Sequence, residues 1–311
     1  MIIEVEHLIK RYASAADNAL DDISFTVEAG EFFSLLGPNG AGKTTTLSIL
    51  TTTLSPTSGR VIVAGQDVLK NPGEVRRKSG IIFQNRSLDE NLTAEENIRL
   101  HAILYGMYDF RPTFKTMPRD YKRRVHHLAN LLGIDSEIFN PIKSFSGGMK
   151  RKLEIVRGLI HEPQVLFLDE PSTGLDPESR RNLWQYLTDV RVSKGVTIFL
   201  STHYLEEAEG ADKICIINKG RIVSLGTPSQ IKADLVHGHL IIDAENRNQL
   251  RAELKELGVS FIEAPQFKVT LNNCTAHQII KSINTPLNLV RTNAPSLEDA
   301  YLRIVAGRPW N

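Results

Sequence analysis

The sequence predicts an α/β protein built on a mixed sheet, followed by a small α+β domain. Two unbroken apolar runs, residues 165–168 and 196–200, flank a segment with apolar residues at helical spacing, 179–192. Continuous apolar strands on either side of a helix indicate a parallel sheet buried on both faces, with a right-handed crossover. A composition break at residues 226–229 precedes a second pattern of strands and helices.

Composition allows a large core and argues against several classes of protein. At 311 residues the chain suits one large or two modest domains. Its 37 basic and 36 acidic residues give a net charge of +1, so no overall field favours nucleic acid or an anionic membrane. Cys215 and Cys274 lack the spacing of a disulfide framework or zinc site, which fits a reducing cytosol. The first residues alternate like a strand rather than a signal peptide, and no apolar stretch of about 18 residues predicts a membrane span.

The first 36 residues are expected to form antiparallel strands. Apolar and polar residues alternate around Ile3 and Val5, and again from Ile23 through Phe25 to Val27. Such alternation is typical of strands with one buried face.

A glycine-rich segment joins an apolar run, residues 32–36, to a helical pattern that begins near residue 47. It comprises Gly37, Pro38, Asn39, Gly40, Ala41, Gly42, Lys43, Thr44 and Thr45. Its spacing and context match a P-loop, in which backbone N–H groups wrap phosphates, Lys43 reaches the terminal phosphates and Thr44 binds Mg²⁺. A plain glycine turn would need four coincidences of residue and spacing. Branched threonines are mediocre helix formers, so an anion on the N-terminal N–H groups would favour this helix.

Short strands and then a helical insert are expected in the middle of the chain. Strands are predicted at residues 60–64 and 81–83, and helices at 94–104 and 121–132. Between the helices, residues 106–120 contain one glycine and two prolines and cannot continue a helix. This loop is rich in apolar residues. It could contact a partner or simply pack against its own domain, and the sequence leaves both open.

Two adjacent carboxylates, Asp169 and Glu170, end the apolar strand 165–168. Because side chains alternate along a strand, the two must face different directions. Asp169 is suited to hold Mg²⁺, directly or through water, and Glu170 to polarise the attacking water as general base. A strand that merely ends in acids is common, but explains less in a chain with a P-loop.

A second helix start with bare amide groups is expected at Ser146, Gly147 and Gly148. Ser146 is a good N-cap, and the two glycines leave the N–H groups of the first turn uncovered. A helix start of this kind binds an anion. Capping alone would be an equally good explanation without the rest of the chain.

These motifs together resemble the nucleotide-binding subunits of ABC transporters. In order over residues 1 to about 225, they are the P-loop, Gln84, the segment 146–148, the strand that ends at Asp169 and Glu170, the segment 172–176 and His203. The resemblance implies a P-loop ABC ATPase cassette at residues 1–228. It would combine a mixed-sheet core, an antiparallel β subdomain and a helical subdomain at about 86–160.

The resemblance also implies residue roles and a dimer. Tyr12 would stack on adenine, Gln84 would sense Mg²⁺ and the partner subunit, and His203 would contact the γ-phosphate. Asp176 would lie in the dimer interface. Two subunits, as homodimer or heterodimer, would sandwich two ATP molecules head to tail, with each P-loop facing Ser146 of the other subunit.

Two features resemble the daunorubicin-resistance type of drug exporter ATPases. The segment 145–149 departs from the family, because it reads Phe-Ser-Gly-Gly-Met where the family often has Leu-Ser-Gly-Gly-Gln, and its continuation Met149-Lys150-Arg151 resembles that subgroup. Residues 296–302 resemble the end of the subgroup's small C-terminal domain. For residues 229–311 the order βαββαβ plus a terminal helix predicts a ferredoxin-like domain. The expected elements are strand 239–244, helix 246–257, strands 259–263 and 267–271, helix 275–284, strand 287–292 and helix 296–306.

The implied function is an ATPase subunit, with ATP and Mg²⁺ as cofactors, on the cytoplasmic face of the cell membrane. It would power export of a drug, lipid or polysaccharide-like substrate through a separate membrane permease. A soluble ABC ATPase acting on ribosomes or nucleic acid is the alternative. Such proteins usually carry tandem cassettes or a long coiled coil, and this sequence has neither, nor a basic excess, so no nucleic acid partner is expected. A regulatory module with little turnover would require a damaged site, yet Glu170 and His203 are present.

Overall fold

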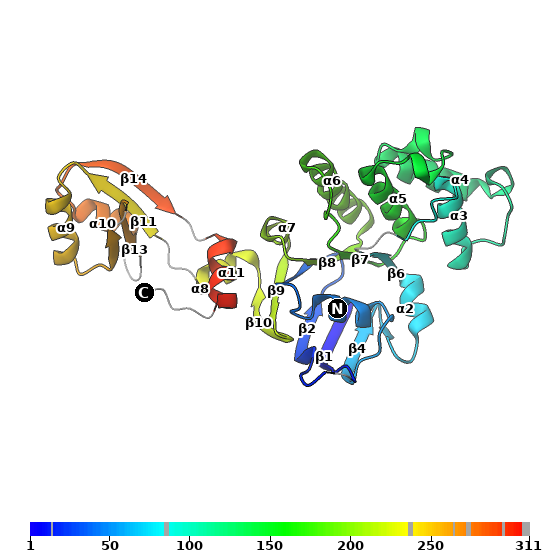
Figure 1. Ribbon diagram of the computed structural model, residues 1–311, viewed down its shortest axis with the longest axis horizontal. Coiled ribbons are helices and arrows are strands. Elements are labelled where there is room, and N and C mark those ends of the chain that lie inside the picture. Colours follow the sequence, from blue (N-terminus) through cyan, green and yellow to red (C-terminus); the bar gives the residue numbers. More distant parts are fainter. Residues whose placement is uncertain are drawn as a thin grey trace. The chain divides into compact units, whose positions relative to one another are not determined.

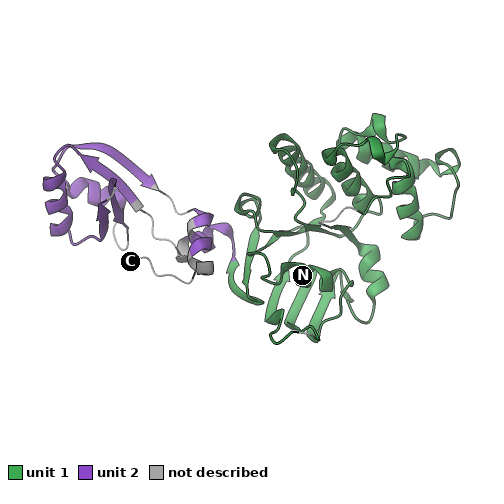
Figure 2. Cartoon of the chain, viewed as in Figure 1, with its two compact units in different colours: residues 1–225 green, residues 226–311 purple. Residues whose placement is uncertain are grey.

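The chain forms two compact units, residues 1–225 and 226–311 (Figure 2). The computed structural model describes residues 1–13, 15–83, 87–235, 239–263, 265–271, 275–293 and 296–306. Each unit has its own apolar core and its own sheet structure. Within the described residues, no helix combines the length and apolar character needed to cross a membrane.

An antiparallel sheet in the first unit has the strand order β2-β1-β4-β5. Its strands are β1 (Ile3–Lys10), β2 (Leu20–Val27), β4 (Ser58–Val63) and β5 (Gln66–Asp67). In β2 the apolar Ile23, Phe25 and Val27 are buried while Ser24 is exposed. The alternation therefore predicted this sheet correctly.

The central sheet of the first unit has the order β10-β9-β3-β8-β7-β6. Its strands are β3 (Phe32–Leu36), β6 (Ser79–Ile82), β7 (Val165–Asp169), β8 (Thr197–Thr202), β9 (Lys213–Asn218) and β10 (Arg221–Gly226). β3 pairs in parallel with β8 and β9, and β7 pairs in parallel with β6 and β8. Every residue of β3, β7 and β8 is buried, as the continuous apolar runs predicted. Placing β3 among the antiparallel strands of residues 1–36 was wrong, because this run is buried on both faces rather than one.

Helices cover the central sheet and form the predicted insert (Figure 1). Outside the insert lie α1 (Lys43–Leu50), α2 (Pro72–Lys78), α6 (Pro177–Lys194) and α7 (Leu205–Glu209). The insert contains α3 (Ala94–Leu104), the 3₁₀ turn η1 (Phe114–Thr116), α4 (Arg119–Leu131), the turns η2 (Asp135–Glu137) and η3 (Ile142–Ser144), and α5 (Gly147–Leu159). Helix α3 has the predicted bounds because a capping box of Thr93 and Glu96 fixes its start. Helix α4 begins two residues before the predicted 121.

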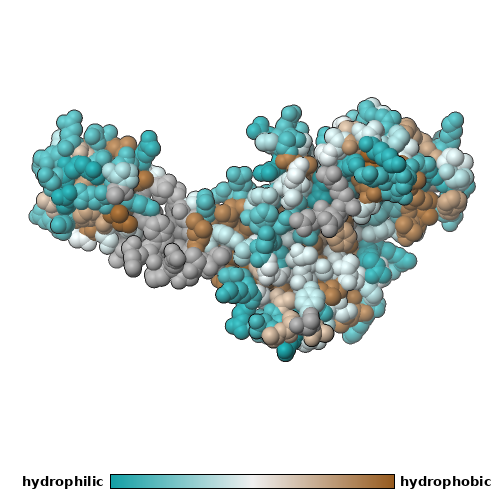
Figure 3. All heavy atoms as spheres, in the orientation of Figure 1, coloured by the Kyte–Doolittle hydropathy of each residue, from teal (hydrophilic) through white to brown (hydrophobic). Residues whose placement is uncertain are grey.

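The loop at residues 106–120 is partly packed and partly exposed. The hydroxyl of Tyr108 donates to Asp120 over 2.6 Å, and the Phe114 ring packs edge-on against Phe139. Phe110 is 69% exposed, and so is most of Leu104 just before the loop. Figure 3 shows apolar surface, in brown, on this side of the helical insert.

A half-buried cluster of aromatic and imidazole rings joins the end of α5 to α3. The ring of Tyr105 lies 4.2 Å from that of His101 and 4.4 Å from that of His161. Nε2 of His161 lies 2.9 Å from the carbonyl oxygen of Ser79 at the start of β6. Burial lowers the pKa of His161, and it lowers the pKa of His101 to about 3. Both rings are therefore neutral in the folded protein near pH 7.

Replacing His101 should make stability less sensitive to acid. The unfolded chain takes up a proton on this ring near its ordinary pKa of 6.5, whereas the folded protein does not. The stability that depends on the neutral ring is therefore complete above that pH and is lost as pH falls toward the lowered pKa. Urea denaturation at pH 7 and at pH 5 measures how far the unfolding free energy falls between them. This decrease should be about 1 kcal/mol smaller for His101→Gln than for the wild type. His127→Gln, at an exposed position of α4, is the control, and an equal effect in both variants would contradict the prediction.

The second unit contains an antiparallel sheet with the order β12-β13-β11-β14. Its elements are α8 (Pro228–Leu235), β11 (His239–Ala244), α9 (Arg247–Glu256), β12 (Phe261–Glu263), β13 (Phe267–Thr270), α10 (Ala276–Ser282), β14 (Leu287–Asn293) and α11 (Leu297–Ala306). Leu240, Leu250, Phe267 and Val269 are fully buried in its core. The predicted elements of residues 239–306 are confirmed to within two residues at each end. Helix α8 was not predicted, because its start coincides with the turn residues of the composition break.

Candidate functional site

Three motifs far apart in the sequence meet at one edge of the central sheet. β3, β8 and β7 are neighbouring parallel strands, so their carboxyl ends lie side by side (Figure 1). Lys43 follows β3, Glu170 follows β7 and His203 follows β8. The sheet order therefore assembles the site.

The glycine-rich loop presents backbone donors at the start of α1. Gly42 is the N-cap, and it has no side chain that could accept the first N–H groups of the helix. Gly40 and Gly42 have φ angles of 79° and 109°, which favour glycine. A Cβ on Gly42 would lie 2.7 Å from Cδ2 of Leu20. The loop thus has the form of an anion cradle.

Threonines of α1 satisfy part of the helix by themselves. The hydroxyl of Thr46 donates to the carbonyl of Gly42 over 2.9 Å, and that of Thr51 donates to the carbonyl of Leu47 over 2.8 Å. Such bonds compete with regular helix geometry, and α1 ends at Leu50 after eight residues. The short helix agrees with the poor intrinsic propensity of its sequence.

Lys43 is folded against its own loop. Its side chain is almost fully buried, and Nζ donates to the carbonyl oxygens of Gly37 at 2.7 Å and Pro38 at 3.1 Å. Burial lowers the pKa of this lysine, and the nearby carboxylates of Glu170 and Asp169 oppose that shift. The ammonium is thus already at the loop where phosphate oxygens could replace the two carbonyl acceptors.

Glu170 is held against His203. Oε1 of Glu170 lies 2.8 Å from Nδ1 of the imidazole, and the glutamate side chain is only 11% exposed. The backbone of Glu170 has a φ of 45°, an uncommon and strained conformation for a glutamate. Its N–H donates to the carbonyl of Ser201 at 2.9 Å, and its carbonyl accepts from the N–H of Thr173 at 3.2 Å. Neighbouring strands thus fix both the backbone and the direction of this carboxylate.

Asp169 and Thr44 offer suitable oxygens for Mg²⁺. Asp169 is buried, and burial raises the pKa of its carboxyl group, so a cation beside it would favour the charged form. Mg²⁺ prefers hard oxygen ligands and keeps several waters or phosphate oxygens. Within the described residues, no group of three or more His, Cys, Asp or Glu side chains is placed to hold a metal ion. The oxygens present therefore fit a Mg²⁺ whose ligands come partly from the protein and partly from a bound phosphate, not from the protein alone.

A pocket of 370 Å³ contains seven of the predicted site residues. It is lined by Ala19, Asn39, Gly40, Gly42, Lys43, Thr44, Thr45 and Glu170. The hydroxyl of Tyr12 lies 3.3 Å from Oγ1 of Thr45, and the residue is 41% exposed, with Nζ of Lys10 over its ring. The structure therefore brings Tyr12 to the rim of the pocket, where a planar group could stack on it.

Ser146, Gly148 and Asp176 lie apart from that pocket in the described structure. Ser146 caps α5 and accepts from the N–H of Met149 at 3.2 Å, and Asp176 caps α6 and accepts from the N–H of Ser179 at 2.9 Å. The hydroxyl of Ser179 also donates to Asp176 over 2.6 Å, and these two hydrogen bonds lower the pKa of Asp176. A Cβ on Gly148 would lie 3.3 Å from Oγ of Ser179, so the two helix starts are adjacent. The prediction for Gln84 falls outside the described residues.

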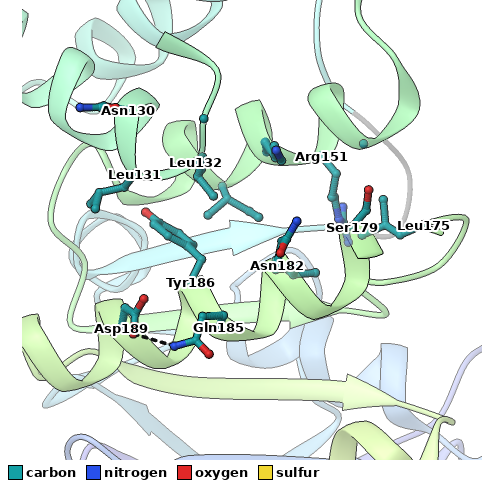
Figure 4. Close-up of a pocket in the computed structure, with 15 residues that line it drawn as sticks. Asn130, Leu131, Leu132, Arg151, Leu175, Ser179, Asn182, Gln185, Tyr186 and Asp189 are labelled. Carbon is teal, nitrogen blue, oxygen red and sulfur yellow. Dashed lines mark hydrogen bonds between the residues drawn. The ribbon is translucent and has the colours of Figure 1, made fainter. Parts of the chain in front are cut away.

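Figure 4 shows the cavity between α5 and α6 beside these helix starts. It has a volume of 390 Å³. Leu175 and Ser179 lie at one end, and the Tyr186 side chain extends from α6 toward Leu131 and Leu132. The Tyr186 hydroxyl is buried and makes no hydrogen bond within the described structure.

Arg151 was missed as a site residue by sequence reasoning. Its guanidinium, extending from α5, is buried and donates to the carbonyl oxygens of Pro171 and Phe83, each at 2.8 Å. It also pairs with Glu154 at 3.0 Å. Arg151 and Glu154 lie opposite Leu153 and Val156 on the helix, and an ion pair at this spacing is usually exposed, so no local pattern marked Arg151 as buried.

Comparisons with known proteins agree with this geometry. The family described as ABC transporter matches residues 20–173. The probable multidrug ABC transporter ATP-binding protein YbhF of Escherichia coli (strain K12) is 37% identical over 232 residues, which cover 75% of this chain but 38% of that protein. The daunorubicin/doxorubicin resistance ATP-binding protein DrrA of Streptomyces peucetius is 37% identical over 263 residues, covering 83% and 76% of the two chains. A solved ATP-binding subunit of an ABC transporter has a TM-score of 0.66 and 32% identity, covering 75% of this chain and 93% of that one.

Proposed function

The chain belongs to the ABC transporter family, as an ATP-binding subunit of the drug-exporter subgroup, and we propose that it hydrolyses ATP to power export through a separate membrane permease. The observation that carries the proposal is the single pocket that holds both Lys43 and Glu170, with His203 on the glutamate. A drug, lipid or polysaccharide-like molecule is the proposed substrate class. The proposed location is the cytoplasmic face of the membrane.

The geometry suggests a division of labour among the residues of the pocket. The ammonium of Lys43 donates hydrogen bonds to the terminal phosphates in place of the carbonyls of Gly37 and Pro38. Glu170, oriented by His203, accepts the proton of a water that attacks the γ-phosphorus. The bond from that phosphorus to the β,γ-bridging oxygen breaks, which leaves ADP and inorganic phosphate. Thr44 and Asp169 would hold Mg²⁺, which would supply positive charge to offset the negative charge of the phosphates. In this proposal Gln84 also contacts the metal, and Tyr12 stacks on the adenine.

A head-to-tail dimer is proposed because two anion-binding helix starts exceed what one nucleotide needs. The helix start at Ser146 lies outside the pocket of Lys43, so it is free to receive the phosphate of a second subunit. Asp176 at the adjacent helix start would then face the same interface. ATP would favour the closed dimer because it contacts both subunits only there. Moving such an equilibrium from 1:99 to 99:1 takes roughly 5.5 kcal/mol, a plausible total for two sites with charge-assisted bonds.

Ser146→Asp should abolish hydrolysis without weakening the binding of ATP to the isolated subunit. Aspartate is as good an N-cap as serine, so α5 keeps its start, but its charge repels the partner's γ-phosphate. Turnover should fall about 100-fold or more, while the Kd of the monomer for ATP stays within about twofold. Ser146→Asn is the matched control, because it has the same size and capping ability without the charge. Equal turnover in the two variants would remove Ser146 from the closed site.

Copurification from solubilised membranes tests the transport role. The tagged chain should recover a polytopic membrane protein in stoichiometric amount. Recovery of ribosomes or nucleic acid would overturn the proposal.

We further propose that residues 229–311 form a ferredoxin-like domain. The support is the βαββαβ order of β11 to β14 and the antiparallel strand order β12-β13-β11-β14. A solved structure of this segment with a different strand order would overturn the assignment.

A further inference from the structure

Arg151 connects three parts of the first unit that belong to different steps of the proposed cycle. It lies in the second turn of α5, the helix that begins beside Ser146. Its Nε donates to Pro171 just after Glu170, and Nη1 donates to Phe83 just before residues 84–86. Nη2 lies 3.5 Å from the carbonyl oxygen of Asp169 and 3.4 Å from that of Glu170.

The arrangement is more than a buried ion pair. Glu154 supplies one negative charge to the guanidinium, at 3.0 Å, and the side chains of both residues are at most 6% exposed. The other donors are used on backbone carbonyls, including three successive ones at the end of β7. The planar fork of an arginine can bind several acceptors at once, whereas the ammonium of a lysine acts as a point charge.

The contacts fall on a strained stretch of backbone. Glu170 has its positive φ of 45° between the peptides of Asp169 and Glu170, two of the three whose carbonyls face Arg151. A residue in that conformation keeps it only when its surroundings hold it there. Arg151 is one of those supports. It contacts the backbone of Glu170 from α5, a separate element that packs outside the sheet.

We propose that Arg151 is a positioning residue that couples the helix start at Ser146 to the carboxylate of Glu170. This role rests on the proposed function. A partner's nucleotide bound at Ser146 shifts α5, and Arg151 passes that shift to the backbone of Asp169, Glu170 and Pro171. Hydrolysis at one nucleotide site then depends on occupancy of the other.

The test compares three variants of the full-length protein by ATPase kinetics and thermal unfolding. Arg151→Gln should lower kcat at least tenfold while KM for ATP stays within twofold, and the Hill coefficient for ATP should fall toward 1. Arg151→Lys keeps the charge beside Glu154, so its Tm should stay close to the wild type, but kcat should still fall severalfold.

Arg157→Gln is the matched control, because Arg157 lies on the same helix and its Nη1 donates to the carbonyl of Ser87 at 2.6 Å, away from β7. This variant should lose thermal stability but keep kcat within twofold. If Arg151→Gln fails to fold, Arg151→Lys decides. Three results would overturn the coupling role. The first is an Arg151→Lys variant with the kcat and Hill coefficient of the wild type, and the second is an equal loss of kcat in Arg157→Gln. The third is a Hill coefficient of 1 in the wild-type protein itself. A wild-type protein that binds ATP but does not hydrolyse it would refute the proposed function itself, and this role with it.

Discussion

Glu170→Gln is expected to stop ATP turnover while leaving ATP bound. The amide keeps the size of the carboxylate but cannot accept a proton from the attacking water, and a general base contributes about 100- to 10,000-fold to such a step. The neutral side chain also removes a negative charge near the phosphates. ATP-bound dimers should therefore accumulate. Size-exclusion chromatography should show an earlier elution peak in the presence of ATP and no such shift in the presence of ADP.

The control for this variant is Glu206→Gln, an exposed glutamate in the first turn of α7. It changes the net charge equally and should hydrolyse ATP at the wild-type rate. Turnover of Glu170→Gln within a few-fold of the wild type would remove Glu170 from the role of base. Loss of turnover without dimer accumulation would instead indicate that the substitution disturbs the site before closure.

Lys43→Met is expected to abolish useful ATP binding. A hydrogen bond to a charged group contributes roughly 1.5–3 kcal/mol, so loss of the ammonium should weaken binding by about 100-fold. Methionine preserves the apolar stem that is buried in the loop. At an ATP concentration 100 times the wild-type Kd, the ligand stabilises the wild type by about 2.7 kcal/mol and the variant by about 0.4 kcal/mol. Denaturation with and without ATP measures this difference directly.

Lys143→Met, at an exposed position of η3, is the control and should retain the full stabilisation by ATP. A Lys43→Met protein that still gains more than about 2 kcal/mol from ATP would place the nucleotide elsewhere. A variant that is unstable without ATP would show that the bonds from Nζ to Gly37 and Pro38 support the empty loop.

Local sequence was sufficient where a motif carries its own geometry. The glycine-rich loop could be recognised because φ angles above zero at Gly40 and Gly42 need glycine, and because Lys43 and Thr44 follow at fixed spacing. The buried strands could be recognised because β3, β7 and β8 are apolar throughout. The error over β3 arose at the boundary between two sheets, where a five-residue apolar run follows alternating strands.

Contacts between distant segments could not be obtained in the same way. The 2.8 Å contact of Glu170 with His203 depends on β7 and β8 being neighbours in the sheet, and the contact of Tyr12 with Thr45 depends on how a loop returns to α1. Arg151 has an ordinary place in an amphipathic helix, and nothing in its spacing shows that it faces the end of β7. The separation of Ser146 from the pocket of Lys43 likewise follows from the fold.

The sequence by itself determined the chemical groups of the site, because P-loop, paired acids and capped glycines are each set by residues adjacent in the chain. Only the tertiary structure decided which groups meet: Lys43, Glu170 and His203 at one sheet edge, Ser146 and Asp176 at another place, and Arg151 between them. The physical reason is that a side chain's partners depend on strand order and helix packing, and these result from the burial of apolar surface over the whole unit.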